Sequence, residues 1–197
     1  MTDKTEEQIL HPYQEKSDDA LYGAFLSGNN EAYDALMLRY GDSLTIYLNR
    51  YLQSLQDTED MMIEAFARIM VRKPMIRGSF KAYLYQTARN SAVRLYRKKR
   101  RTEVFSLDGL ERELADVRRT EDDLRDRERD QALHRCMARL EPQLREVIWL
   151  KYFENMSYED AAKVTGVSKK RVDNLLQRGK EQLKAELKKE GITHVFD

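Results

Sequence analysis

Hydrophobic residues recur at helical spacing through two stretches of the chain, 18–101 and 131–190, and become sparse between them. Early in the first stretch most of them fall three or four residues apart, as on one face of an amphipathic helix. They are Leu21, Phe25, Leu26, Ala32, Leu36, Tyr40, Leu44, Tyr47, Leu48 and Leu52. Neither stretch shows the alternation typical of a strand. The pattern predicts an all-α protein with two small helical domains.

The segment between the two domains differs from both in composition. Residues 102–130 carry Glu, Asp and Arg with few large apolar groups, which cannot sustain a core of their own. We therefore predict a flexible linker there. The mixed-charge start, 1–17, is predicted to be a flexible tail, and 191–197 a short C-terminal tail.

Residues 155–188 predict two short helices that meet at a glycine turn, the arrangement of a DNA-binding helix-turn-helix. Ser157 is expected to cap the first helix, with Asp160 placed to return a hydrogen bond as in a capping box. Gly166 supplies the left-handed turn residue, and Ser168 caps the second helix.

The second helix of this motif has a clear division between apolar and polar faces. Its predicted buried stripe is Val172, Leu175, Leu176, Gly179 and Leu183. Its outward residues are Lys170, Asp173, Asn174 and Gln177. Lys169, Lys170 and Arg171 lie in the first turn, where the helix dipole disfavours cations and a phosphate backbone would favour them. The alternative is a solvated basic end of a small helical domain.

The segment 79–101 is predicted to be a helix that mixes aromatic residues with arginines on its exposed face. Its predicted buried stripe is Phe80, Leu84, Ala88, Ser91 and Leu95. The opposite face then carries Tyr85, Arg89, Val93 and Tyr96, with Gln86, Asn90 and Arg97 alongside. Such a face suits single-stranded nucleic acid, because bases stack on rings and guanidinium planes. Alternatively, the tyrosines belong to the core and the cations match the helix dipole.

A further helix is predicted over 57–70, with acidic residues at its start and with Met62, Phe66 and Ile69 buried. Its outward residues are Asp60, Ile63, Glu64 and Ala67. An acidic surface with an isoleucine at its centre fits a protein partner better than a nucleic acid. A lone exposed apolar residue is also common on ordinary surfaces.

Composition gives enzyme chemistry little support. The chain of 197 residues has no Walker loop and no G-x-S-x-G motif. Its histidines, at 11, 134 and 194, are scattered, and His134 with Cys136 would supply at most two of the four ligands of a structural zinc. We therefore predict no catalytic residue, no metal and no cofactor.

Cysteine content and hydropathy predict a cytoplasmic protein, and the charge pattern bears on nucleic-acid binding. The net charge is only +1, so a nucleic-acid surface requires segregated cations, as in the acid-free run 89–101. The single Cys136 suits a reducing compartment. No apolar run approaches ~18 residues and the start lacks a signal-peptide core, so we predict no direct membrane insertion.

Three motifs resemble, in order and spacing, the bacterial extracytoplasmic-function sigma factors. They are DTEDMMIEAFARIM at 57–70, GSFKAYLYQTARNSAVRLYRKKRR at 78–101 and LEPQLREVIWLKYFENMSYEDAAKVTGVSKKRVDNLLQRGKEQL at 140–183. The resemblance extends from Asp18 to Leu187. It implies sigma domain two and sigma domain four without domain three, in a subunit that directs RNA polymerase to promoters.

The resemblance also implies roles for particular helices. It implies that 57–70 docks on the beta-prime clamp helices of core polymerase, that 77–99 melts and reads the minus-ten element, and that 168–184 reads minus-thirty-five. The implied polymerase-binding residues are Asp57, Glu59, Asp60, Ile63, Glu64 and Ala67. The implied minus-ten residues are Arg77, Ser79, Tyr85, Gln86, Arg89, Asn90, Tyr96, Arg97 and Lys98. The implied minus-thirty-five residues are Ser168, Lys169, Lys170, Arg171, Asp173, Asn174, Gln177 and Arg178.

Further implied partners are promoter DNA, the polymerase beta flap and an inhibitory anti-sigma factor. The chain departs from the family pattern at Ile63, where glutamine is usual, and at Tyr83, where tryptophan is usual. Asp173 and Asn174 stand where a basic residue and a small hydroxyl are typical. A carboxylate accepts from cytosine N4 and asparagine pairs with adenine, so we expect an unusual promoter sequence.

Two other classes of protein stay open at this point. A helix-turn-helix regulator acting on duplex DNA without polymerase would explain 155–188 but not the aromatic and basic face of 79–101. A protein that only sequesters a partner would explain the acidic face of 57–70 but not the cations at 169–171. Co-purification with core polymerase separates these alternatives.

Overall fold

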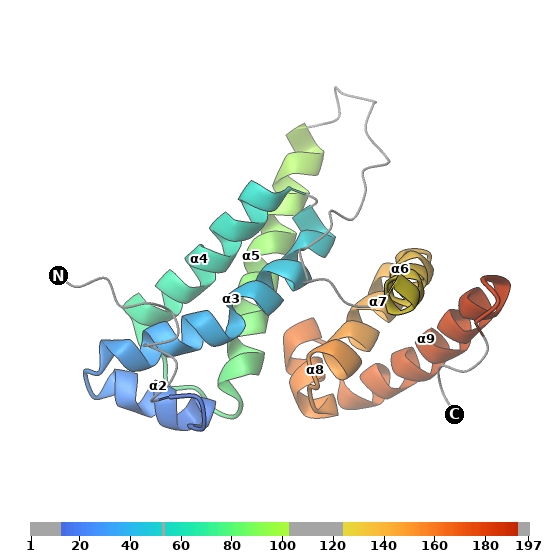
Figure 1. The fold of residues 1–197 in the computed structure, drawn as a ribbon. Coiled ribbons are helices and arrows are strands. Elements are labelled where there is room, and N and C mark those ends of the chain that lie inside the picture. Colours follow the sequence, from blue (N-terminus) through green and yellow to red (C-terminus); the bar gives the residue numbers. More distant parts are fainter. Residues whose placement is uncertain (1–12, 53, 103–123, 193–197) are drawn as a thin grey trace. The chain divides into compact units, whose positions relative to one another are not determined.

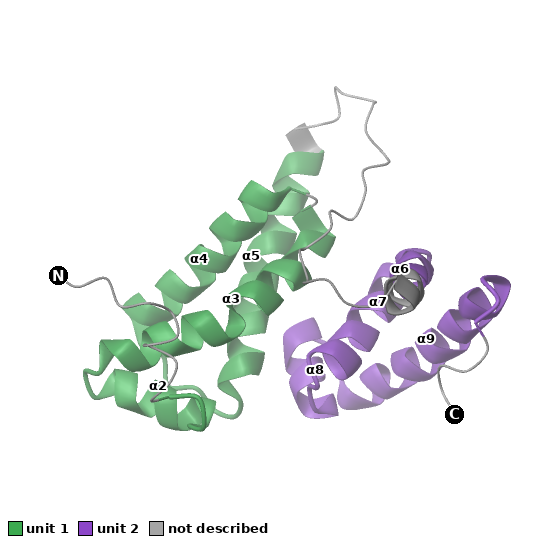
Figure 2. Ribbon diagram, viewed as in Figure 1, with its two compact units in different colours: residues 1–112 green, residues 113–197 purple. Residues whose placement is uncertain are grey.

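The computed structural model describes residues 13–52, 54–102 and 124–192 (Figure 1). Within these ranges every regular element is helical, which confirms the all-α prediction. The chain divides into two compact units, residues 1–112 and 113–197 (Figure 2). Each unit has its own buried core, as the two hydrophobic stretches of the sequence predict.

Over its described residues, 13–52 and 54–102, the first unit is a bundle of four helices with an aromatic core. Its helices are α2 (Asp18–Leu26), α3 (Asn30–Leu52), α4 (Leu55–Arg72) and α5 (Phe80–Thr102). α5 packs against α2, α3 and α4, so neighbours surround much of its circumference. Tyr33 and Phe66 meet edge to face with ring centroids 5.9 Å apart, and the Tyr33 hydroxyl donates to the Phe66 carbonyl at 2.6 Å. This contact joins α3 to α4 inside the core.

The packed part of the first unit begins closer to the N-terminus than predicted. Tyr13 is 7% exposed, its hydroxyl accepts from the Asn29 amide at 3.2 Å, and its carbonyl accepts from Arg39 at 3.0 Å. Arg39 also holds Asp18 in an ion pair at 2.6 Å. The predicted flexible tail over 1–17 is therefore wrong at Tyr13, because a buried aromatic ring and two hydrogen bonds anchor it. Residues 1–12 lie outside the described part of the chain.

The second unit contains the helix-turn-helix. Its helices are α6 (Leu124–Ala138), α7 (Pro142–Ile148), the π-helical turn η2 (Trp149–Phe153), α8 (Tyr158–Thr165) and α9 (Lys169–Lys189). α9 packs against α6, α7 and α8. The helix-turn-helix motif thus occupies α8 and α9, and α6 and α7 pack against α9.

α6 begins inside the segment predicted to be a flexible linker, 102–130. The prediction is wrong for 124–130, which are helical, while 103–123 lie outside the described residues. The physical reason is that Ala132, Cys136 and Met137 are buried and anchor the helix. Once such a nucleus exists, residues with good helix propensity extend it at little cost.

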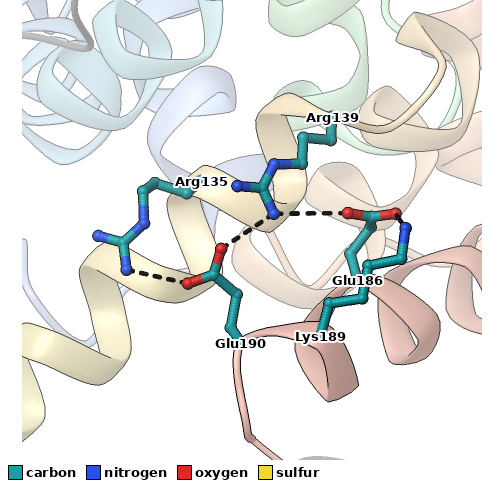
Figure 3. A network of polar contacts seen from close by, with 5 residues as sticks. All are labelled: Arg135, Arg139, Glu186, Lys189 and Glu190. Carbon is teal, nitrogen blue, oxygen red and sulfur yellow. Dashed lines mark hydrogen bonds and ion pairs between the residues drawn. The ribbon is translucent and has the colours of Figure 1, made fainter.

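Ion pairs join α6 to the C-terminal end of α9 (Figure 3). The Arg139 guanidinium lies 2.9 Å from Glu190 and 3.5 Å from Glu186, and Arg135 lies 3.4 Å from Glu190. Lys189 pairs with Glu186 at 2.5 Å. Hydrogen bonds from Arg139, then from Arg135, lower the pKa of Glu190. Because these side chains meet solvent, the network orients the helix end more than it stabilises the unit.

Candidate functional site

The outward face of α4 is acidic with an apolar centre, as predicted. Ile63 is 52% exposed, and Glu59 and Asp60 lie beside it in solvent. Glu64 forms an ion pair with Arg68 one turn later on the same helix. Phe66 and Ile69 are buried as predicted, whereas Met62 is only half-buried. The face therefore offers carboxylates around an apolar contact, with Ala67 half-buried at its edge.

Two residues that the sequence interpretation left out extend this apolar centre. Met70 is 45% exposed and Val71 is 79% exposed. They follow Ile63 by two helical turns and Ala67 by one, so all four point to the same side of α4. The signal that could have found them is apolar spacing on the polar side of the helix, continued past the acidic residues.

Asp57 lies at the start of α4 and is engaged by α5. Its backbone N–H donates to the Ser54 hydroxyl at 3.4 Å, which caps the helix. Its carboxylate forms an ion pair with Lys99. The hydrogen bond from Lys99, followed by that from Ser54, lowers the pKa of Asp57. Asp57 thus ties α4 to α5 besides bordering the acidic face.

One predicted base-stacking residue, Tyr85, is in the wrong place. Tyr85 is 0% exposed, its ring centroid lies 5.1 Å from that of Tyr47, and its hydroxyl hydrogen bonds to Ser43 at 2.9 Å. Ala82 and Ala92 are buried beside it. The prediction assumed one buried stripe, but α5 has helices on several sides and buries two adjacent rows. Tyr85 is core, as the alternative interpretation allowed.

The outward row of α5 is shifted from the predicted one. Asn90, Arg97 and Lys98 are exposed, and Gln86 and Arg89 are half-buried. Helical spacing places Tyr83 on the row of Gln86, Asn90 and Arg97, where it is half-buried. Tyr83 is therefore the aromatic residue that replaces Tyr85 on this face. Its position was marked in the sequence by the family's usual tryptophan.

The far end of α5 carries a second accessible ring. Tyr96 is 42% exposed, and the Arg100 guanidinium lies 5.7 Å from its centroid. Of the earlier candidates, Arg77 is exposed, and Ser79 is half-buried. The Ser79 hydroxyl accepts the Ala82 N–H at 3.2 Å and so caps α5. A ring beside a guanidinium can take a stacked base, so base stacking at Tyr96 stays a prediction.

The turn between α8 and α9 has the predicted geometry. Ser157 accepts the Asp160 N–H at 3.0 Å, Gly166 is left-handed with φ 73°, and Ser168 accepts the Arg171 N–H at 3.2 Å. Asp160 differs from the capping-box prediction, because its carboxylate accepts from the Ser157 hydroxyl, at 2.8 Å. The hydroxyl already serves the helix terminus, so the carboxylate secures the cap itself.

α9 divides into faces as the sequence predicts. The residues predicted to be buried are buried, namely Val172, Leu175, Leu176, Gly179 and Leu183. The exposed candidates are Ser168, Lys169, Lys170, Arg171, Asn174, Gln177 and Arg178, and Asp173 is half-buried. Lys169 forms an ion pair with Glu159 of α8, whose pKa is lowered chiefly by that hydrogen bond. Arg178 lies 3.5 Å from Glu141.

A close approach to α7 sets the position of α9. An added Cβ on Gly179 would lie 2.8 Å from Ile148 Cδ1 and 3.5 Å from Leu144 Cβ. Real Cβ atoms do not come that near, so the crossing requires glycine or a shift of Ile148. Gly179 therefore holds the outer face of α9 at a fixed distance from its support.

The π-helical turn before α8 has no counterpart in the sequence interpretation. Trp149 stacks on Phe153 with centroids 4.2 Å apart, and its indole N–H donates to the buried Glu154 carboxylate at 3.0 Å. Asn155 follows with φ 50°, a left-handed conformation that asparagine tolerates. This turn leads the chain from α7 into α8, and hydrophobic spacing alone gives no signal for it.

The described residues contain no cluster of three or more His, Cys, Asp or Glu side chains suited to a metal ion. Cys136 is buried, and burial raises the pKa of its thiol. Among the same residues, no helix combines the length and hydropathy needed to span a bilayer.

Two family models match the chain in the order of its two units. The sigma-70 region 2 model matches residues 36–102, which include α4 and α5. The sigma-70 region 4 model matches residues 130–183, which include the helix-turn-helix. Together the matches cover the helices on which the candidate residues lie.

Relatives and solved structures agree with these matches. The chain is 27% identical to the sigma-H factor of Pseudomonas aeruginosa over 160 residues, covering 76% of this chain and 83% of that one. It is also 27% identical to the ECF sigma-E factor of Escherichia coli over 161 residues, covering 77% and 84%.

The fold is similar to two solved structures of complexes. CnrH in complex with the cytosolic domain of CnrY gives a TM-score of 0.62 at 24% identity, covering 87% of this chain and 97% of that one. RpoE of Bartonella quintana, in complex with the anti-sigma factor NepR, gives 0.61 at 20%, covering 79% and 96%. With both sigma-70 regions matched in order and with ECF relatives over most of its length, the chain belongs to the extracytoplasmic-function sigma factors of the sigma-70 family.

Proposed function

We propose that this alternative sigma factor docks on core RNA polymerase through the exposed face of α4 and reads promoter DNA with α5 and α9. The observation that carries the proposal is the separation of surface chemistry among these helices. α4 presents carboxylates around Ile63, whereas α5 and α9 present cations and amides, with rings on α5. Carboxylates repel phosphate, so the three faces suit different partners.

Docking through α4 rests on exposed apolar area with a charged rim. Ile63, Met70 and Val71 are exposed to solvent. Their apolar side chains contribute no free energy of burial until a partner covers them. Glu59 and Asp60 beside them would select a basic partner surface. We assign this partner as the beta-prime clamp helices of core polymerase, with Glu64 and Ala67 at the edge of the contact.

Reading of the minus-ten element rests on the outward row of α5. Asn90 offers a donor and an acceptor to an unpaired base, Tyr83 and Tyr96 offer rings, and Arg97 and Lys98 offer charge to phosphates. Such a surface acts on single strands, because splayed bases can stack where paired bases cannot. The promoter must therefore be open, or be opened, at this helix.

Reading of the minus-thirty-five element rests on the first half of α9. Asn174 and Gln177 are exposed amides on one side, suited to base edges in the major groove. Lys170 and Arg171 lie in the first turn, suited to the flanking phosphates. Asp173, half-buried beside them, suits the cytosine amino group. We place the beta flap of polymerase as a further contact of this unit.

The finer organisation follows the same proposal. We propose sigma domain two over 18–101 and sigma domain four over 131–190, with regulation by an anti-sigma factor that covers the polymerase- and promoter-facing surfaces. RpoE of Bartonella quintana, a sigma factor of similar fold, was solved in complex with an anti-sigma factor. The chain then works in the cytoplasm as an initiation factor and leaves catalysis to the polymerase.

The docking assignment is tested by a charge reversal on α4. Ile63→Arg with Glu64→Lys should abolish pull-down of core polymerase and run-off transcription, because it inserts cations where the partner surface is basic. A matched control is Leu26→Arg with Asp19→Lys, which makes the same change at exposed positions of α2. Unchanged pull-down by the α4 variant would overturn the docking assignment.

A further inference from the structure

The segment between α4 and α5, residues 73–79, carries Arg77 and Ser79, two of the minus-ten residues that the resemblance to sigma factors implies. It contains no regular structure, and Met75 within it is 87% exposed. A segment with so little buried area cannot hold one conformation by its own packing. Contacts from the rest of the bundle must therefore set its shape.

Tyr22 of α2 contacts the segment near its start and also contacts the residue that follows its end. Its hydroxyl donates to the Pro74 carbonyl at 2.8 Å, and its ring packs 5.2 Å from the ring of Phe80, the first residue of α5. Tyr22 is 6% exposed, so water competes little for this bond. Burial, followed by the neighbouring Tyr83, raises the pKa of Tyr22 above its ordinary value.

Lys73 turns the chain out of α4 in a left-handed conformation. It has φ 41° and ψ 54°, and its N–H donates to the Ile69 carbonyl at 2.9 Å. A residue other than glycine adopts positive φ only where its surroundings compensate. Here the Lys73 ammonium lies 4.8 Å from the centroid of the Phe25 ring, and Tyr22 holds the next residue, Pro74.

We infer that Tyr22 and Lys73 are positioning residues that hold 73–79 in the shape in which it meets the promoter. The inference rests on the proposed reading of the minus-ten element, and on the roles that the resemblance implies there for Arg77 and Ser79. Neither positioning side chain needs to touch DNA. They act by fixing where the segment leaves α4 and where it enters α5, so Arg77 and Ser79 are presented in one arrangement.

The test removes one hydroxyl and keeps the ring. Holoenzyme made with Tyr22→Phe is challenged with a pool of fork-shaped templates randomised over the minus-ten region, and the bound fraction is sequenced. We expect enrichment of preferred sequences to fall about fivefold, the size of one lost hydrogen bond. Tyr33→Phe is the matched control. The Tyr33 hydroxyl also donates to a backbone carbonyl, at 2.6 Å, but that carbonyl belongs to Phe66 in the middle of α4 and not to 73–79. The control variant should keep the enrichment of the unaltered chain.

A second pair of variants isolates the backbone at Lys73. Lys73→Asn and Lys73→Val both remove the ammonium from Phe25, but asparagine tolerates positive φ and a β-branched residue does not. The asparagine variant should therefore select templates much better than the valine variant. Pull-down of core polymerase should be the same for both, because 73–79 lies outside the proposed docking face.

The outcomes separate this inference from the proposal beneath it. If the unaltered holoenzyme enriches no sequence, the minus-ten role itself fails. If it enriches sequences and Tyr22→Phe matches Tyr33→Phe, the positioning inference is overturned. Should Tyr22→Phe not fold, equal selection by the two Lys73 variants would overturn it in the same way.

Discussion

The two helices proposed to read DNA, α5 and α9, are packed differently, although the same hydrophobic period predicts one buried stripe on each. On α9 the buried residues follow one stripe, and the predicted outward residues are outward. On α5 the buried residues occupy two rows, which takes Tyr85 out of solvent and leaves Asn90 and Arg97 in it. A helix among several neighbours cannot be divided into faces by period alone.

The largest expected effect contrasts two tyrosines of α5. Tyr85→Ala removes a fully buried ring and should cost ~3–5 kcal/mol of unfolding free energy. Tyr96→Ala removes a ring that is 42% exposed and should stay within ~1 kcal/mol of the unaltered chain. Denaturant titration measures both. Equal losses of unfolding free energy would mean that Tyr85 is not buried in the core, and would contradict the contrast between α5 and α9.

The next effect concerns the support of α9. Gly179→Leu should destabilise the second unit by ~1–3 kcal/mol, because the added side chain meets Ile148 and Leu144. Gly23→Leu is the matched control, since Gly23 is also helical and has nothing within 4 Å of an added Cβ. Thermal unfolding of the two variants tests the close crossing. The close crossing of α7 and α9 would be refuted if Gly179→Leu were as stable as Gly23→Leu.

Much of this organisation could be predicted, and the failures share a cause. Ser157, Gly166 and Ser168 are local signals, and each has the predicted role. Tyr85, the Asp57–Lys99 ion pair and the extent of α6 depend on residues distant in sequence or on a helix growing from a buried anchor. Hydrophobic period carries no information about such partners.

A third prediction separates specificity from affinity on α9. Asn174→Ala should cost ~1–3 kcal/mol at one minus-thirty-five position and relax specificity there. Lys170→Ala should weaken all sites about equally and reduce the salt slope by ~1. Lys169→Ala should reduce the slope less, because the Lys169 ammonium is already paired with Glu159. Duplex binding at several salt concentrations distinguishes them, and equal slopes for the two lysine variants would contradict the last point.

The smallest effect is a pH dependence in the first unit. Because Lys99 lowers the pKa of Asp57 below the ordinary 3.8, the carboxylate adds stability above that pH and loses it as pH falls through the lower folded value. Lys99→Met should raise the pKa of Asp57. The first unit should then lose less stability as the pH falls through the acid range. NMR titration of the Asp57 carboxyl measures the shift. An unchanged pKa would show that Lys99 does not hold α4 to α5.

The most direct test of the central claim compares Asn90→Ala and Asn174→Ala by permanganate footprinting on duplex and premelted promoters. Permanganate reports unpaired thymines, so it separates melting from duplex recognition. We expect Asn90→Ala to reduce opening of the duplex promoter and to alter minus-ten selection, with minus-thirty-five preference retained. We expect Asn174→Ala to relax minus-thirty-five preference and to leave the premelted template unaffected. Normal melting by Asn90→Ala together with intact minus-thirty-five preference in Asn174→Ala would contradict the assignment of both helices.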